Sequence, residues 1–307
     1  MRNSKNIRTG CDFLELNRNK TLHILTIMII LLSIVVTVTG VFYSTNGKPY
    51  DFVNQYGDIV KMYGNGIYAH DSYFKAPIFR GTDFTMLFLS TPLLIFTLIF
   101  DLKRNTLKSK MLLASVISVF TYYSASIAFG VTYNNLLLAY IGLFSLSFFG
   151  LVVAFLSIDL KKITENLSSQ ISSKGIYIFL IITGISLFIA WLPDIISAVM
   201  AGRSLSLIEV YTTEITYVLD MGIISPVAFI SLYLLKKRNG LGLVLLQMLL
   251  ILCIIIGIML PVQSIFQVSA GIEIPMLALI TKVAIFSLMS IFALFFEIKL
   301  IKNIKNE

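Results

Sequence analysis

"LGLVLLQMLLILCIIIGIMLP", residues 241–261, is the stretch of sequence that decides the fold. It runs for 21 residues without a charged side chain. A helix of about 20 mostly apolar residues is long enough to cross the hydrocarbon core of a bilayer. We therefore expect a membrane-spanning helix over these residues.

Seven further stretches of similar length and apolar character surround this segment, at about 23–43, 84–100, 111–131, 136–158, 176–195, 215–235 and 276–297. The chain of 307 residues is 57% hydrophobic and only 13% charged, whereas soluble proteins carry about 25% charged residues. Its surface must therefore be solvated by lipid. The sequence predicts an all-α fold, a polytopic transmembrane bundle of about eight spans. The first span is too long for a signal-peptide core and no cleavage site follows it, so we expect it to be retained.

Lysine and arginine alternate along the chain between the predicted connections. Eighteen of the 24 lie in segments 1–22, 101–110, 159–175, 236–240 and 298–307, and five lie in segments 44–83, 132–135, 196–214 and 262–275. Cytoplasmic loops carry the excess of positive charge in membrane proteins. This pattern places both termini in the cytoplasm, and it also accounts for the net charge of +8. No soluble basic face is present, so nucleic acid is not an expected partner.

The predicted domain organisation is a cytoplasmic basic tail at 1–22, a single transmembrane domain at 23–297 and a cytoplasmic tail at 298–307. The order of features in 23–158 and in 176–297 is similar, which suggests a parallel repeat of four helices each. "TDFTMLFLSTP" (82–92) and "LDMGIISP" (219–226) both place an aspartate ahead of a proline, although by nine residues in one case and six in the other.

The single long loop, 44–83, lies on the predicted outer side. Apolar residues recur at helical spacing from Phe52 to Tyr63, which favours an amphipathic helix on the outer surface. "GNG" at 64–66 would end that helix. The stretch that follows, 66–83, would form a lid-like loop with His70, Asp71 and Arg80 as its candidate functional residues. The alternative is an ordered loop that covers the bundle without a function of its own.

Polar side chains inside the predicted spans gather in the outer half of the bundle. Ionisable groups at membrane depth are costly and are functional candidates by default. The candidate ligand-binding residues are Asp83, Tyr122, Asp194, Tyr217, Asp220 and Lys282. The ammonium of Lys282 needs a partner, and Asp220 fits best by depth, with Asp194 and Asp83 nearer the surface as the other available carboxylates. The set predicts an outward-facing polar cavity, with a purely structural Asp220–Lys282 pair as the alternative.

No motif for a catalytic centre, a cofactor or a metal is present. None of the Walker, GxGxxG, HExxH, GxSxG and CxxC motifs occurs in a sequence context that would support its function. Cys11 and Cys253 are too far apart in sequence to suggest a disulfide framework, and His23 and His70 form no metal-ligand spacing. Catalytic residues stay unassigned, and we expect no cofactor and no metal.

Three stretches carry a resemblance: "GIYAHDSYFKAPIFRGTDF" (66–84), "YYSASIAFGVTYNNLLLAYIGLFSLSFF" (122–149) and "TTEITYVLDMGIISP" (212–226). Together they resemble a family of uncharacterised multi-pass bacterial membrane proteins, over most of residues 50–240. The resemblance implies an integral protein of a prokaryotic cell membrane. It implies no activity.

Three classes of function are compatible with this sequence. The first, which we favour, is the transport or binding of a small molecule or ion in the outward cavity. The second is an enzyme embedded in the membrane that acts on a lipid-linked substrate at the outer leaflet, with two carboxylates as acid and base. The third is a non-catalytic partner or sensor subunit whose protein partners are unknown. The expected partner is the lipid bilayer, and the ligand would be a small molecule or a lipid.

Overall fold

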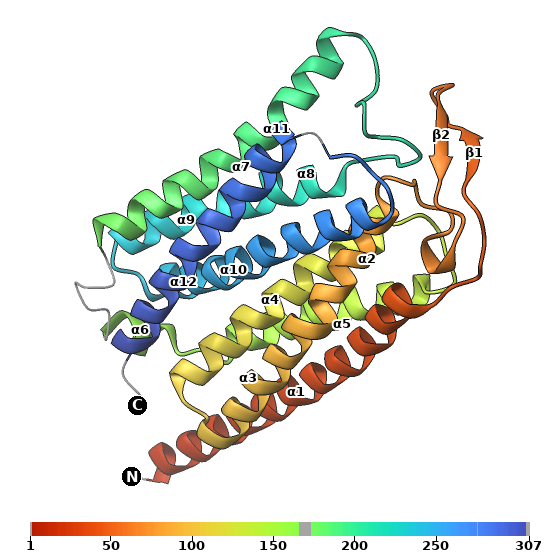
Figure 1. Ribbon diagram of the computed structural model, residues 1–307. Helices are drawn as coiled ribbons and strands as arrows, with labels where there is room; N and C mark the ends of the chain where they lie inside the picture. Colours follow the sequence, from red (N-terminus) through yellow and green to blue (C-terminus); the bar gives the residue numbers. More distant parts are fainter. Residues whose placement is uncertain (1, 166–172, 275, 305–307) are drawn as a thin grey trace.

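The computed structural model shows a long bundle of roughly antiparallel helices (Figure 1). It describes residues 2–165, 173–274 and 276–304, with side chains described from residue 17 onward except at 278, 279, 281 and 282. Helix α1 begins, and helix α12 ends, at one end of the bundle, which we call the terminal end. A β-hairpin stands at the opposite end, which we call the hairpin end.

Seven helices among the described residues are long and apolar enough to cross a membrane, which confirms a polytopic helical membrane protein. They are Asn17–Phe42 within α1 (Arg2–Phe42), Ala76–Arg104 (α2, Ala76–Thr85; η2, Met86–Ser90; α3, Thr91–Arg104), α4 (Leu107–Gly130), α5 (Leu137–Leu156), α7 (Lys174–Met200), Ile215–Lys236 (α8, Ile215–Leu219; η3, Asp220–Ile224; α9, Ser225–Lys236) and α10 (Gly240–Ser269). The eighth predicted span corresponds to α11 (Met276–Ala278), η4 (Leu279–Ala284) and α12 (Ile285–Asn303). A short helix, α6 (Leu160–Glu165), lies at the terminal end.

The helices form two groups of four with the same order of neighbours. In the first group α1 packs against α2–α3 and α5, and α4 packs against α3 and α5. In the second group α7 packs against α9 and α12, and α10 packs against α9 and α12. The groups meet where α2 and α4 pack against α10, and where α8 packs against α4. Helices α4 and α10 therefore form the centre of the bundle.

Two of the spans contain a π-helical turn just before a proline. The turn η2 ends at Ser90, two residues before Pro92, and η3 ends at Ile224, two residues before Pro226. Proline has no N–H to donate and its ring clashes with the carbonyl four residues earlier, so the helix widens there. Such interruptions of an α-helix occur often at functional sites.

The predicted amphipathic helix in the outer segment is wrong. Residues Tyr50–Val53 (β1) and Ile59–Met62 (β2) pair as an antiparallel hairpin. The turn explains the difference: the side chain of Asn54 accepts hydrogen bonds from the backbone N–H groups of Tyr56 and Asp58, and Gly57 takes a φ of +86°. Asn and Gly at these positions favour a turn, and the flanking aromatic and β-branched residues favour strands.

The predicted lid-like loop is also shorter than expected, because helix α2 begins at Ala76 rather than after residue 83. Gly64 and Gly66 do take positive φ values, of 75° and 65°, but they shape the loop and cap no helix. A short 3-10 helix, η1 (Gly66–Tyr68), follows them. Residues 66–75 remain as the loop that approaches the bundle.

Candidate functional site

A cavity of about 330 Å³ lies between the two helix groups, in the half of the bundle nearer the hairpin end. Its wall is mainly apolar, so the sequence-based expectation of a polar cavity holds only for a few side chains. The polar and aromatic residues of its wall include Lys75, Phe79, Thr82, Tyr122, Tyr123, Ser126, Trp191, Glu214, Tyr217, Asp220, Gln263 and Phe286. A mainly apolar pocket with a few convergent polar groups is typical of a small-molecule site.

An ion pair lies in the wall of this cavity at the hairpin end. Lys75 Nζ contacts Glu214 Oε1, and both side chains are nearly buried, at 12% and 13% exposed. Lys75 Nζ also lies 4.1 Å from the centre of the Tyr211 ring. Lys75 is the N-cap residue of α2, and Glu214 is the N-cap residue of α8. The pair therefore joins the residues that precede α2 and α8, the segments of the two interrupted spans that lie on the hairpin side of their π-helical turns.

Asp220, the first residue of η3, lies deep in the wall and is 5% exposed. It accepts a hydrogen bond from Tyr122 Oη on α4 at 2.8 Å and another from Trp191 Nε1 on α7 at 2.9 Å. The Trp191 ring stacks on Tyr217 with 4.6 Å between centroids. Tyr217 Oη in turn donates to Asp194 Oδ2 at 2.8 Å. The structure thus brings together four of the residues that the sequence nominated.

Asp83 lies apart from the cavity wall and is fully buried. It accepts hydrogen bonds from Tyr68 Oη at 2.5 Å and from Tyr123 Oη at 2.6 Å. Its carboxyl group also packs against α1, because a Cβ atom added at Gly40 would lie 1.7 Å from Oδ2. Asp83 therefore fixes α2 to α1, to α4 and to the loop that contains Tyr68.

Adjacent tyrosines of α4 thus donate hydrogen bonds to the two aspartates. Tyr122 donates to Asp220 and Tyr123 donates to Asp83. Neighbouring residues of a helix point about 100° apart, so the two carboxylates lie on different sides of α4. Asp220 faces the cavity and Asp83 faces the first helix group.

The three candidate residues of the lid have different surroundings, and none of them lines the cavity. His70 is exposed and lies 3.3 Å from Tyr50 Oη of the hairpin. Arg80 donates to Tyr63 Oη at 2.8 Å and to the Val41 carbonyl at 2.9 Å.

Asp71 links three connections at the hairpin end and is fully buried. Its Oδ1 atom accepts hydrogen bonds from Tyr211 Oη and from the Thr132 backbone N–H, both at 3.0 Å. Burial raises the pKa of Asp71 to about 7, and the hydrogen bonds from Thr132 and Tyr211 offset only part of that rise. Ser72 Oγ next to it donates to Glu209, and burial raises the pKa of that carboxyl as well.

Lys282, the remaining candidate, lies in η4, and its side chain is outside the described residues. Its pairing with Asp220 stays a prediction. The other wall residues that matter most, Lys75 and Glu214, were not among the candidates, because Lys75 falls in the predicted loop and the two residues lie 139 positions apart. The sequence signal that could have identified Lys75 is a basic residue beside aromatic side chains where a loop meets a span.

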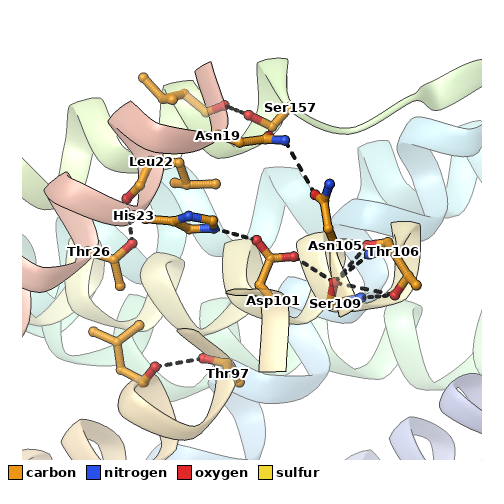
Figure 2. Close-up of polar contacts among 12 residues, drawn as sticks. Asn19, Leu22, His23, Thr26, Thr97, Asp101, Asn105, Thr106, Ser109 and Ser157 are labelled. Atoms are coloured by element: carbon orange, nitrogen blue, oxygen red, sulfur yellow. Dashed lines mark hydrogen bonds and ion pairs between the residues drawn. The ribbon is translucent and has the colours of Figure 1, made fainter. Parts of the chain in front are cut away.

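A second polar cluster lies at the terminal end (Figure 2). His23 Nε2 of α1 lies 2.8 Å from Asp101 Oδ2 of α3, and Ser109 Oγ of α4 donates to Asp101 Oδ1 at 2.6 Å. Asp101 is fully buried. No partner for His23 could be predicted from the sequence, because His23 and Asp101 lie 78 positions apart. The cluster fixes the terminal ends of α1, α3 and α4 to one another.

Nothing in the described part of the chain gathers three or more His, Cys, Asp or Glu side chains as a metal site would require. In comparisons with protein-family models, with curated proteins and with solved structures, the chain gives no significant match. The cavity and its charged groups are therefore the basis on which a function can be argued.

Proposed function

We propose that this protein binds a small, largely apolar molecule in the cavity and moves it across the membrane. The observation that carries the proposal is the cavity between the two helix groups, with the Lys75–Glu214 pair, one residue from each group, in its wall at the hairpin end. We take this pair to be the closure of the cavity on that side. Its volume of about 330 Å³ is within the range of small-molecule sites.

The interrupted spans supply a way for this closure to open. Paired interruptions at corresponding positions of two repeats point to the binding site in many transporters. Here η2 and η3 occupy corresponding positions, each two residues before a proline. The arms α2 and α8 lie on the hairpin side of these turns, and both line the cavity. A hinge at either turn would separate Lys75 from Glu214 and open the cavity toward the hairpin end, which is the predicted outer side.

The native Cys253 offers a direct test, because its side chain lines the cavity. In a Cys11→Ser background, a water-soluble thiosulfonate reagent reacts with Cys253 when water reaches the cavity. We expect slow reaction from outside in the parent and about tenfold faster reaction in Glu214→Gln, because loss of about 1.4 kcal/mol from the closed state shifts opening tenfold. Lys61→Met is the matched control, since Lys61 is exposed and lies over Tyr73.

The side of the membrane from which the reagent reaches Cys253 distinguishes a transporter from a protein that only binds its ligand. If the protein is a transporter, Cys253 also reacts in inside-out vesicles, and the fraction of protein labelled there changes when the Lys75–Glu214 pair is broken. Reaction from the outer side alone, in every variant, would contradict transport. Equal and negligible reaction of parent and Glu214→Gln, with full reaction of the unfolded chain, would reject the gated cavity itself.

A further inference from the structure

The charges around the cavity are not balanced within the described part of its wall. Lys75 and Glu214 compensate each other across the closure. Asp220 receives its two hydrogen bonds from Tyr122 and Trp191, which are neutral donors. A carboxylate removed from water needs a compensating positive charge or a proton. Among the described side chains of this wall, which do not include Lys282, Asp220 is therefore the group that would gain most from a cationic ligand.

Aromatic rings stand beside this carboxylate. Trp191 and Tyr217 are stacked with an interplanar angle of 23°, and both line the cavity with Tyr122. The faces of such rings carry negative charge density and attract organic cations, with tryptophan the strongest. A carboxylate next to aromatic faces inside an apolar cavity recognises a cation that carries an apolar body.

We infer that the cavity selects amphipathic organic monocations, with the ammonium group beside Asp220 and the apolar body along the rest of the wall. This inference rests on the proposed function and specifies its ligand class. Asp83 provides the internal comparison, because it is also buried and also accepts two hydrogen bonds, yet it does not line the cavity. Asp220, and not Asp83, should therefore respond to a ligand.

A series of probes with one body and three head groups tests the charge preference. The probes are 4-phenylbutylamine, 4-phenylbutan-1-ol and 4-phenylbutyrate, and the measurement is the rise in unfolding temperature of the detergent-solubilised protein. We expect the amine to give the largest rise, the alcohol a smaller one and the carboxylate none. Asp220→Asn should reduce the effect of the amine to that of the alcohol, and Asp83→Asn should leave the difference between them unchanged.

A second measurement uses Cys253 and does not depend on stability. The background is Cys11→Ser with Lys75→Met and Glu214→Gln, which opens the closure without leaving a net charge there. The ratio of reaction rates for a cationic and an anionic thiosulfonate of similar size, divided by the same ratio for a free thiol, reports the charge of the cavity. We expect a normalised ratio of roughly tenfold in favour of the cation, lost in Asp220→Asn and retained in Asp83→Asn.

The outcomes separate this inference from the proposed function. Stabilisation by all three probes alike, or a rate ratio that Asp220→Asn leaves unchanged, would overturn the cation preference and retain a cavity that binds apolar molecules. A preference for the carboxylate probe would overturn it as well and would indicate a positive charge in the wall. No stabilisation by any probe, together with an unreactive Cys253 in the opened background, would reject both proposals.

Discussion

Replacing Gly40 by alanine tests whether the Asp83 carboxyl group is locked against α1. A Cβ atom at this position would lie 1.7 Å from Asp83 Oδ2, 2.7 Å from its Cγ and 3.1 Å from Tyr68 Oη. An ordinary contact begins near 3.4 Å, so the carboxyl group would have to withdraw by about 1.7 Å. That displacement is incompatible with hydrogen bonds of 2.5 and 2.6 Å to Tyr68 and Tyr123.

The size of the effect follows from those two bonds. A hydrogen bond to a charged group contributes about 1.5–3 kcal/mol, so losing both costs about 3–6 kcal/mol. Alanine in place of glycine within a helix contributes about 1 kcal/mol in the opposite direction. We therefore expect Gly40→Ala to lower the free energy of unfolding by about 2–5 kcal/mol, measured by reversible denaturation in detergent.

Gly222→Ala is the matched control, since no atom lies within 4 Å of a Cβ added there. It should leave stability unchanged or raise it by up to about 1 kcal/mol. In an Asp83→Ala background, Gly40→Ala should cost much less, because the obstructing carboxyl group is gone and only Tyr68 Oη, at 3.1 Å, has to shift slightly. Equal stability of Gly40→Ala and the parent protein would refute the reasoning, and so would an undiminished loss in the Asp83→Ala background.

Three further predictions follow from other parts of the molecule. If Lys282 pairs with Asp220, Lys282→Met should lower the free energy of unfolding by about 3–5 kcal/mol, and adding Asp220→Asn should restore much of that loss. Additive losses in the double variant would exclude the pair. A confirmed pair would mean that Lys282, and not a ligand, supplies the positive charge beside Asp220. Burial raises the pKa of Asp71 from the ordinary aspartate range to about 7, so between about pH 4 and 7 the folded state holds a proton that the unfolded chain releases. Stability should therefore fall as pH rises from about 4 to 7, by at most about 4 kcal/mol, and Asp71→Asn should flatten this slope. The predicted orientation places Tyr133 outside the cell and Lys103 in the cytoplasm, and both residues are exposed. A cysteine at position 133 should therefore react with an impermeant reagent in whole cells, and one at position 103 only after lysis. The reverse result would show that the orientation is inverted.

The spans could be predicted from the sequence because hydropathy alone determines which segments lipid can solvate. Their ends could not, because α2 begins eight residues before the predicted span and its first turns contain Arg80 and Asp83. These charged residues lowered the local hydropathy, yet their side chains find partners at the end of the bundle. The hairpin was missed because Phe52, Val53, Ile59 and Val60 fit a helical period as well as a strand pair, and the turn at Asn54 and Gly57 decides between them.

The site was predicted in part. Depth and polarity identified Asp220, Tyr122 and Tyr217, which do line the cavity. The same criteria selected Asp83, whose hydrogen bonds serve to hold helices together. Sequence cannot separate these two aspartates, because the difference lies in which side of α4 each one faces. The pairs Lys75–Glu214 and His23–Asp101 join residues 139 and 78 positions apart, so they depend on how the helices pack.

The contrast between the two arms gives the proposed gate a fixed side and a moving side. Helix α2 approaches α10 so closely that a Cβ at Gly81 would lie 2.7 Å from the backbone of Gln263, whose side chain also donates to Thr82 at 2.7 Å. Asp83 fixes the same helix to α1 and α4. Helix α8 has five residues and meets Gly130 of α4 through the side chain of Ile215. Closely packed backbones bonded on three sides resist displacement, whereas a short helix held by side chains can swing about the π-helical turn that follows it. Opening would therefore move α8, with Glu214 and Tyr217, away from a stationary Lys75, about the turn that begins at Asp220. Asp220 itself would stay bonded to Tyr122 and Trp191.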